Sequence, residues 1–463
     1  MAEPRARKAL GGTNQRQAKK ERKKARNLHT SNPGSPVRER KSTRIVLLFV
    51  VLLLGYFYSG VQRISAGVIL PHLGRTLGFS AALVGFLSSL FFYSYGFTQN
   101  VWGAISDRLG PLRSCAIGMG LAAAGSALVL LSPEPLFLGL SRFLCGLGLA
   151  SFFTGIYIYA ALAFPEDEYP FWVGFVQVIG NLGTVAAVAP LGFLMDAFGY
   201  RGVYTILTVW ALCVSGTLWL TRNSHIRIHA APAETPKYEG LGAIVRLTWE
   251  DIKHGYRFIA GNRSVGLIVF AWSVVSAAVM ALQGLWGVSW VSVSSGATES
   301  TARFWTTLVS MGLVIGAICG ARAAARYRDI RGGMLAILCP LSCAWIVYLV
   351  FSWLRLPAHV TGIVGFLVGV GSSTCMVYSI STIKSLVPLS RAGLAIGTGQ
   401  MLLYVAVIVV QWGSGVIINL FPGAEQGTYL NRGFLLAFGV MTALVLLSAL
   451  FAWRMPPTST HSK

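Results

Sequence analysis

One arginine stands inside a long apolar segment, where a charge is costly. Arg63 lies in the run Tyr58–Pro71, and apolar residues extend beyond it in both directions. Burial of an ionised group in hydrocarbon costs several kcal/mol, so such a residue is a candidate for function. A guanidinium that faces a central cavity can bind an anion through its hydrogen-bond donors. The alternative is a side chain that extends toward the helix end and places its charge at the water interface.

Other polar and aromatic side chains in the apolar segments are weaker candidates for contact with a small solute. In this group we place Gln283, Trp286, Tyr93 and Asn181. Further aromatic residues that could line a cavity are Tyr56, Tyr58, Phe92, Tyr95, Tyr157 and Tyr404. For each of these residues taken alone, packing in the core or against lipid is the more frequent role.

Acidic side chains are missing from the middle of the apolar segments. The sequence contains 16 Asp and Glu residues, and they fall in the first 41 residues, in turns, in residues 221–263 or at segment edges. Many proton symporters use a buried carboxylate as the proton site. The pattern therefore favours exchange or facilitated movement of a solute over proton symport. His72 is the nearest titratable alternative, although a loop histidine is the simpler interpretation.

A charged turn separates two uncharged segments, with the sequence Gly103-Ala-Ile-Ser-Asp107-Arg108-Leu-Gly110-Pro-Leu-Arg113. A turn this short makes the flanking helices antiparallel neighbours, and glycine permits the tight backbone angles that it needs. Asp107 can pair with Arg108 or Arg113, or with the N-terminus of the next helix. A generic basic loop would need only the arginines, so the ordered spacing favours a functional role.

The composition is that of a membrane protein. The 463 residues are 54% hydrophobic and 12% charged, whereas soluble proteins average about 25% charged residues. A spanning helix needs about 20 apolar residues, so the chain after its polar start accommodates about twelve spans. The net charge of +22 would also suit a nucleic-acid-binding protein. Here the positive residues gather in the first segment and in alternate loops, the pattern of cytoplasmic segments, so we expect no nucleic-acid partner.

The sequence contains no pattern typical of an enzyme or a metal site. All seven cysteines fall inside apolar segments, and there is no C-x-x-C or histidine pair at ligand spacing. Neither a nucleophile with its base nor a phosphate-binding G-x-x-x-x-G-K-[ST] loop occurs. We therefore expect no catalytic residues, no metal and no cofactor.

Charge and hydropathy divide the chain into five parts. Residues 1–41 hold thirteen Lys or Arg and three Glu, and predict a disordered basic cytoplasmic tail that could contact anionic lipid headgroups. Residues 42–220 and 264–455 each predict a bundle of six spans. Residues 221–263 predict a cytoplasmic linker with an amphipathic helix, and residues 456–463 a cytoplasmic tail. The spans that matter below are expected at about Arg44–Leu70, Phe171–Leu194, Gly202–Leu220, Ser264–Leu285 and Phe304–Gly320.

The charged turn resembles the loop between the second and third helices of the major facilitator superfamily, and the resemblance covers residues 44–455. It implies an all-α membrane fold of twelve transmembrane helices in two pseudo-symmetric six-helix bundles. A partial repeat of the turn stands at Gly320–Arg331, where Ala324 replaces the aspartate. In that family the loop latches the two halves together on the cytoplasmic side. The implied latch residues are Gly103, Asp107, Arg108, Gly110 and Arg113. Arg142 is added to them because it matches the family's Arg-x-x-x-Gly pattern in the fourth span. For Arg142, a role as an anchor at the membrane interface is an equal alternative.

Within the superfamily the sequence is similar to the organophosphate and sugar-phosphate permeases. The similarity rests on Arg63-x7-Pro71, on Phe92–Gly96 and on Leu282–Gly287. In the glycerol-phosphate and hexose-phosphate exchangers, one arginine from span one and one from span seven bind the phosphate. Arg63 matches the first, but no arginine stands near Met280, where the second would fall. A single guanidinium better suits a monoanion, a zwitterion or a larger solute.

Together these features predict a secondary transporter that moves a small organic solute, most readily an organic anion, by alternating access. It is expected to be a multi-pass protein of the bacterial inner (plasma) membrane with both termini in the cytoplasm. The alternatives are a siderophore, amino-acid or drug carrier of the same fold, or a non-transporting membrane sensor. Nitrate is disfavoured, because Gly180-Asn181-Leu-Gly183 matches only part of a nitrate-transporter signature and lacks its arginine in span two.

Overall fold

The computed structural model describes residues 43–165, 168–222, 241–327, 329–425 and 427–455. The predicted tails at residues 1–41 and 456–463, and residues 223–240 of the predicted linker, lie outside these described residues. The chain divides into two compact units, Met1–Val46 and Leu47–Lys463. Of the first unit the structure describes only Thr43–Val46.

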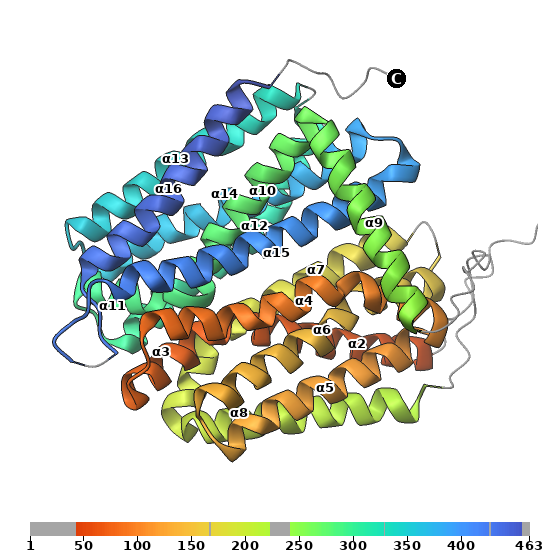
Figure 1. Cartoon of the computed structure of the whole chain (residues 1–463), viewed down its shortest axis with the longest axis horizontal. Coiled ribbons are helices and arrows are strands. Elements are labelled where there is room, and N and C mark those ends of the chain that lie inside the picture. Colours follow the sequence, from red (N-terminus) through yellow and green to blue (C-terminus); the bar gives the residue numbers. More distant parts are fainter. Residues whose placement is uncertain (1–42, 166–167, 223–240, 328, 426, 456–463) are drawn as a thin grey trace, which may run out of the picture. The chain divides into compact units, whose positions relative to one another are not determined.

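The described residues are almost entirely helical, and Figure 1 shows α3–α8 in one group and α10–α16 in another. The helices of the first group, with α2 before them, are α2 Thr43–Ile64, α3 Ala66–Leu77, α4 Ala81–Leu109, α5 Pro111–Leu131, α6 Pro135–Ala163, α7 Tyr169–Ala186 and α8 Ala189–Leu220. After α9 (Leu241–Gly261), those of the second group are α10 Arg263–Ala281, the π-helical η1 Leu282–Trp286, α11 Gly287–Ser295, α12 Glu299–Arg326, α13 Ile330–Trp353, α14 Ala358–Leu386, α15 Leu389–Asn419 and α16 Asn431–Trp453.

Length and apolar composition confirm the membrane fold. Among the described residues, 11 helices are long and apolar enough to cross a membrane, and Phe171–Ala186 is a shorter apolar helix. Side chains that face outward on these helices are largely apolar, because lipid replaces water as their surroundings. The predicted all-α architecture of twelve spans in two six-helix groups is thus confirmed.

The first helix of each group is interrupted, which the sequence did not predict. The span expected at Arg44–Leu70 is two helices, because α2 ends at Ile64 and α3 begins at Ala66. The span expected at Ser264–Leu285 continues as far as Ser295, through the π-helical turn η1. A π-turn within a longer helix often marks a functional position.

The two interruptions lie against each other. A Cβ atom placed on Gly67 of α3 would lie 2.9 Å from the carbonyl carbon of Gly284 in η1 and 3.0 Å from the amide nitrogen of Leu285. Only glycine permits this approach of two backbones. The first and seventh spans therefore meet at their irregular segments, and the irregular segment of η1 is buried in protein, as a membrane requires.

The fifth span is interrupted as well, and its proline explains where. The segment expected at Phe171–Leu194 is α7, which ends at Ala186, and the start of α8. Pro190 has no N–H to donate to the carbonyl of Ala186, four residues earlier, so a continuous helix loses a hydrogen bond there. Within α8, Gly199 adopts φ 64° and ψ 179°. This glycine forms the turn that separates the predicted fifth and sixth spans.

Small residues allow the helices within each group to pack closely. A Cβ on Gly148 of α6 would collide with the Gly118 carbonyl oxygen of α5. In the second group, a Cβ on Gly369 of α14 would collide with the Val309 carbonyl oxygen of α12. In a membrane, where no hydrophobic effect drives helix association, such close backbone contact gains van der Waals energy.

The helix α9 joins the two groups in sequence and contacts helices of both, α4 and α15. Figure 1 shows it in green at the right, running from one group to the other. It covers the segment for which the sequence predicts an amphipathic helix. On its exposed face Lys253 donates a hydrogen bond of 3.1 Å to Glu250, and this contact lowers the pKa of the Glu250 carboxyl.

Candidate functional site

Arg63 lies in the last turn of α2, at the point where the first span is interrupted. Its Nη2 donates a long hydrogen bond of 3.4 Å to the hydroxyl of Tyr95 on α4. The guanidinium carbon also lies 5.4 Å from the centroid of the Tyr95 ring, within the range of a cation–π contact. Its Nε is buried without a hydrogen-bond partner, while the side chain as a whole keeps some exposure. Among the described residues the guanidinium has no carboxylate partner.

The aromatic surroundings of Arg63 come from both helix groups. Tyr404 of α15 packs edge-on against Tyr95, with ring centroids 5.4 Å apart, and stacks with Phe92 at 6.0 Å. Tyr56 precedes Arg63 by seven residues, about two turns of α2, so both lie on the same face of that helix. The Tyr404 hydroxyl accepts a hydrogen bond of 3.2 Å from Gln400 Nε2. We call Arg63, Tyr56, Tyr95 and Tyr404 the arginine–tyrosine cluster.

Tyr93 does not belong to this cluster. Two residues apart on an α-helix are turned by about 200°, so Tyr93 faces away from the side of α4 on which Tyr95 meets Arg63. The sequence offered both tyrosines as possible cavity residues and favoured Tyr93. The periodicity of α4 alone could not choose between them, because both neighbouring faces of this helix are apolar.

The two candidates in the seventh span, Gln283 and Trp286, are buried in η1 and directed into the second group. Gln283 Oε1 accepts a hydrogen bond of 3.3 Å from the Ser310 hydroxyl. Trp286 Nε1 donates a hydrogen bond of 2.9 Å to the Ser414 hydroxyl. These contacts hold η1 against α12 and α15.

Asn181 lies on α7 with intermediate exposure, and its carbonyl accepts a hydrogen bond from the Thr184 hydroxyl. Its flanking glycines have a packing role. A Cβ on Gly183 would collide with the Phe57 carbonyl oxygen of α2, and Gly60 of α2 approaches the Gly180 carbonyl in the same way. This Gly-Asn-Leu-Gly segment therefore holds α7 close to α2.

Arg142 is buried in the first group, 2% exposed. Its Nη1 donates a hydrogen bond of 2.7 Å to the backbone carbonyl of Gln62, beside Arg63. Its guanidinium carbon lies 4.7 Å from the Phe91 ring centroid. Phe91 precedes Asp107 by sixteen residues on α4, about 24 Å at a helical rise of about 1.5 Å per residue. The structure thus places Arg142 near the arginine–tyrosine cluster and away from the loop with which the sequence grouped it.

The other predicted latch residues lie together at the junction of α4 and α5. Gly110 adopts φ 85°, which favours glycine, and Pro111 begins α5. The side chains of Asp107, Arg108 and Arg113 are exposed, whereas Gly103 makes an ordinary contact with Thr154. We call this end of the helices the Asp107 end.

The opposite end of α4 starts at Ala81, about 39 Å away at about 1.5 Å per residue, and there an ionic network joins the two groups. Arg75 Nη2 of α3 contacts Glu299 Oε2 of α12 at 2.6 Å. The second oxygen of Glu299 lies 2.9 Å from Arg303 Nη2. Arg303 Nη1 contacts Asp196 Oδ2 of α8 at 2.6 Å. We call these four residues the ionic network and this end the Arg75 end.

The sequence interpretation missed the ionic network. Its signal was present as the i,i+4 pair Glu299 and Arg303, but the predicted span began at Phe304 and left both residues outside it. In the structure α12 begins at Glu299 and Arg303 is 3% exposed. The partners of Arg303 are far apart in sequence, and hydropathy carries no information about which distant turns meet.

Other contacts between the groups also lie at the Arg75 end. The backbone N–H of Ala189, at the start of α8, donates to the Thr307 hydroxyl of α12 at 3.2 Å. The Tyr429 hydroxyl, from the loop before α16, donates to the Phe79 carbonyl at 3.2 Å. The Arg75 end of the structure is therefore held closed by ion pairs and hydrogen bonds.

Comparisons with known proteins agree with this architecture. Residues 52–410 match the family profile described as Major Facilitator Superfamily. The chain is 21% identical over 422 residues to the gentisate transporter of Corynebacterium glutamicum, a match that covers 88% of each chain. It is 23% identical over 198 residues to the probable sulfoacetate transporter SauU of Cupriavidus necator, covering 42% of this chain and 46% of that protein.

Solved structures share the fold at low identity. A bacterial homologue of the human lysosomal transporter Spinster, in an inward-facing and unoccupied conformation, superposes with a TM-score of 0.67 and 14% identity over 89% of this chain and 97% of that one. The inward-open xylose transporter XylE of E. coli gives 0.65 and 14%, over 90% and 98%.

Proposed function

The chain belongs to the Major Facilitator Superfamily and is a secondary transporter of small organic solutes, and we propose that its solute is an organic anion bound at Arg63. The observation that carries this proposal is the position of the guanidinium. Arg63 is partly exposed at the interruption of the first span and has no carboxylate partner among the described residues. A cation in that position is stabilised when an anion binds it.

The neighbours of Arg63 support a solute with a single negative charge and an apolar body. One guanidinium can bind one carboxylate or sulfonate through two parallel hydrogen bonds. Tyr95, Tyr404 and Phe92 offer ring faces and edges around it, and aromatic rings contribute large apolar contact areas. Among the similar proteins, the gentisate transporter is named for an aromatic monocarboxylate, which fits this class. Sulfoacetate and tartrate are organic anions too, but each carries two negative charges and lacks an apolar body.

We further propose that the two helix groups, residues 42–220 and 264–455, move about this site by alternating access. The arginine–tyrosine cluster includes residues of both groups, so a bound solute would contact both. The ionic network closes the Arg75 end in this structure. The Asp107 loop would close the other end when the Arg75 end opens.

The orientation that fits the charge pattern places the Asp107 end in the cytoplasm. Arg108, Arg113, Arg222 and Lys253 lie in the α4–α5 junction, after α8 and on α9, and basic residues concentrate on the cytoplasmic side of membrane proteins. We propose a location in the bacterial inner membrane with both termini cytoplasmic. The basic segment 1–41 would then face anionic lipid headgroups. Exchange or facilitated movement remains the proposed mode over proton symport.

A paired screen tests the solute class. The purified full chain is heated with matched pairs of compounds, such as benzoate with benzamide and tartrate with erythritol, because a bound ligand raises the melting temperature. The best compounds are then measured for uptake into proteoliposomes. We expect stabilisation and uptake by the anion of at least one pair and by neither neutral partner. Uptake restricted to neutral or cationic solutes would contradict the proposal, and binding without any uptake would favour a sensor.

A further inference from the structure

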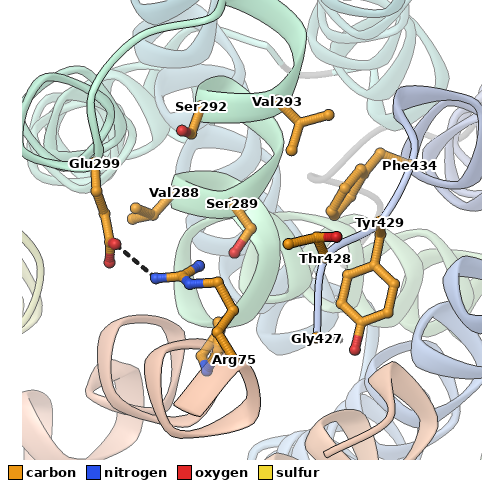
Figure 2. A pocket seen from close by; sticks show the side chains of 11 residues that line it. Arg75, Val288, Ser289, Ser292, Val293, Glu299, Gly427, Thr428, Tyr429 and Phe434 are labelled. Atoms are coloured by element: carbon orange, nitrogen blue, oxygen red, sulfur yellow. Dashed lines mark hydrogen bonds and ion pairs between the residues drawn. The ribbon is translucent and has the colours of Figure 1, made fainter. Parts of the chain in front are cut away.

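A small cavity at the Arg75 end contains the Arg75–Glu299 ion pair (Figure 2). Its volume is about 270 Å³, near the lower limit of about 300 Å³ for small-molecule pockets. Its walls come from α3, α11, α12 and the residues around the start of α16. Arg63 is not among the lining residues, and it precedes Arg75 by twelve residues, about 18 Å along the helices at about 1.5 Å per residue. The cavity is therefore separate from the arginine–tyrosine cluster.

The cavity has hydrogen-bond donors to spare. Among the described residues, the contact of Nη2 with Glu299 is the only hydrogen bond of the Arg75 guanidinium, which carries five N–H donors in all. The Ser289 hydroxyl makes no hydrogen bond within that part of the chain, and Figure 2 shows it directed toward Arg75. Glu299, in contrast, has both carboxylate oxygens engaged, one with Arg75 and one with Arg303. A ligand that accepts hydrogen bonds is therefore favoured over one that donates them.

The rest of the cavity suits a short apolar body. Val288, Val293 and Phe434 contribute apolar side chains to its wall. Figure 2 shows Val293 beyond Ser289 from Arg75, and Val288 beside the Arg75–Glu299 pair. The hydroxyl of Thr428, also at the wall, donates to the Glu425 carbonyl at 2.6 Å. An organic anion with a small apolar group matches both the donors and the walls.

We propose that this cavity is a second anion site, in which an organic carboxylate binds Arg75 and Ser289 and takes the place of Glu299 on Arg75. The exchange leaves no carboxylate unpaired, because Glu299 keeps its contact with Arg303. Tyr429, whose hydroxyl is bound to the Phe79 carbonyl, also lines the cavity beside Arg75.

Occupation of this site would have a conformational consequence. The Arg75–Glu299 pair joins α3 of one group to α12 of the other, and Arg303–Asp196 is the second ion-pair link of the ionic network. A carboxylate on Arg75 replaces the first link with a contact through the anion to the uncharged Ser289 of α11, which is weaker than a charge-assisted pair, and leaves the second. An anion that arrives at the Arg75 end would thus favour the opening of that end and its own access to Arg63. This role rests on the proposed transport of an organic anion.

The test measures binding of 4-fluorobenzoate by fluorine NMR to the full chain in phosphatidylcholine nanodiscs, whose lipids add no net negative charge. Every sample carries Arg63→Gln, so that the arginine–tyrosine cluster does not contribute. We expect saturable binding that 4-fluorobenzamide, the neutral isostere, does not compete. Arg75→Gln should weaken the binding at least tenfold. Glu299→Gln should tighten it at least threefold, because the competing carboxylate is removed.

The controls separate this site from surface charge and from misfolding. Arg201→Gln removes an exposed arginine next to the Gly199 turn and should leave the affinity unchanged. A gain of affinity in Glu299→Gln cannot come from a misfolded protein. The inference is overturned if 4-fluorobenzoate does not bind, if the amide competes equally, or if Arg75→Gln and Glu299→Gln both bind as the parent does. If binding depends on Arg75 but uptake is the same in wild type and Arg63→Gln, the second site is upheld and the proposed function is rejected.

Discussion

Three guanidinium groups in this protein are held in three different ways, and the difference indicates their roles. Arg303 is buried between two carboxylates, Asp196 and Glu299. Arg142 is buried against the Gln62 carbonyl and the Phe91 ring. Arg63 has one long hydrogen bond and a ring contact, both to the same tyrosine, and keeps some exposure. Each of the three keeps at least one buried N–H without a partner. Arg142 and Arg303 are 2% and 3% exposed, so their spare donors are closed off by the protein, whereas the partial exposure of Arg63 leaves its guanidinium within reach of a solute.

The hydroxyl of Tyr95 should contribute modestly to solute binding by orienting Arg63. Tyr95→Phe removes a hydrogen bond to a charged group but keeps the ring, and such bonds contribute about 1.5–3 kcal/mol when well formed. Because this bond is 3.4 Å long, we expect a smaller effect, a two- to fivefold loss of apparent affinity at about 1.4 kcal/mol per tenfold. Uptake kinetics in proteoliposomes measure it. Tyr93→Phe is the matched control and should leave the apparent affinity unchanged. Equal losses in both variants would mean that the side of α4 that faces the solute is wrongly assigned.

At the scale of helices, the sequence predicted the elements well and their interruptions poorly. The spans and the α4–α5 junction follow from hydropathy and from the Gly110–Pro111 step, both of which are local. The interruptions at Ser65 and at η1 depend on the approach of Gly67 to Gly284, a contact between residues more than two hundred positions apart. Pro190 could have predicted the end of α7. Apolar residues continue on both sides of this proline, however, so hydropathy indicated a single span.

The contact between α3 and η1 should control the closure of the Arg75 end. Gly67→Ala adds a Cβ that would lie 2.9 Å from the Gly284 backbone, and backbone atoms cannot move aside as a flexible side chain can. We therefore expect the variant to favour conformations in which α3 and η1 separate. The measurement is a pulsed-EPR distance between spin labels on Thr76→Cys and Ser300→Cys, both exposed positions.

The structure also indicates which native cysteines to remove for the spin-label experiment and which glycine to use as its control. Cys213, Cys319, Cys339 and Cys343 are replaced by serine, since they are the native cysteines that are not fully buried. Gly439→Ala in α16 is the control, because a Cβ there meets no other atom within 4 Å. A longer Thr76–Ser300 distance is expected for Gly67→Ala alone. An unchanged distance distribution in Gly67→Ala would show that the contact between α3 and η1 does not control closure of the Arg75 end.

At the scale of the whole molecule, the four-residue ionic network links the two helix groups through two ion pairs, Arg75–Glu299 and Arg303–Asp196. Its members are unequal. The side chain of Arg303 is 4% exposed, whereas that of Arg75 is 33% exposed. Loss of a partner costs more when it leaves a buried charge such as that of Arg303 without compensation than when both partners are partly exposed, as Arg75 and Glu299 are at 33% and 32%. The central member, Glu299, therefore matters more to closure than the peripheral Arg75.

Substitution of Glu299 should open the Arg75 end more than substitution of Arg75. Glu299→Gln removes the carboxylate that both arginines share, and Arg303 keeps only Asp196. Arg75→Gln removes a contact whose two side chains are each about one-third exposed and leaves the Arg303 contacts intact. The same Thr76–Ser300 spin-label pair should show a larger population of long distances in Glu299→Gln than in Arg75→Gln. The reverse order would show that burial does not set the strength of this network.

The central claim is that Arg63 binds the anionic group of the solute, and uptake by an Arg63→Gln variant tests it most directly. The best anion from the paired screen is measured in proteoliposomes with wild type, with Arg63→Gln and with the exposed control Arg201→Gln, at matched amounts of folded protein. A charge-assisted hydrogen bond contributes about 1.5–3 kcal/mol, so uptake efficiency should fall about 10- to 100-fold in Arg63→Gln and stay unchanged in Arg201→Gln. Equal uptake of the anion by wild type and Arg63→Gln would contradict the account.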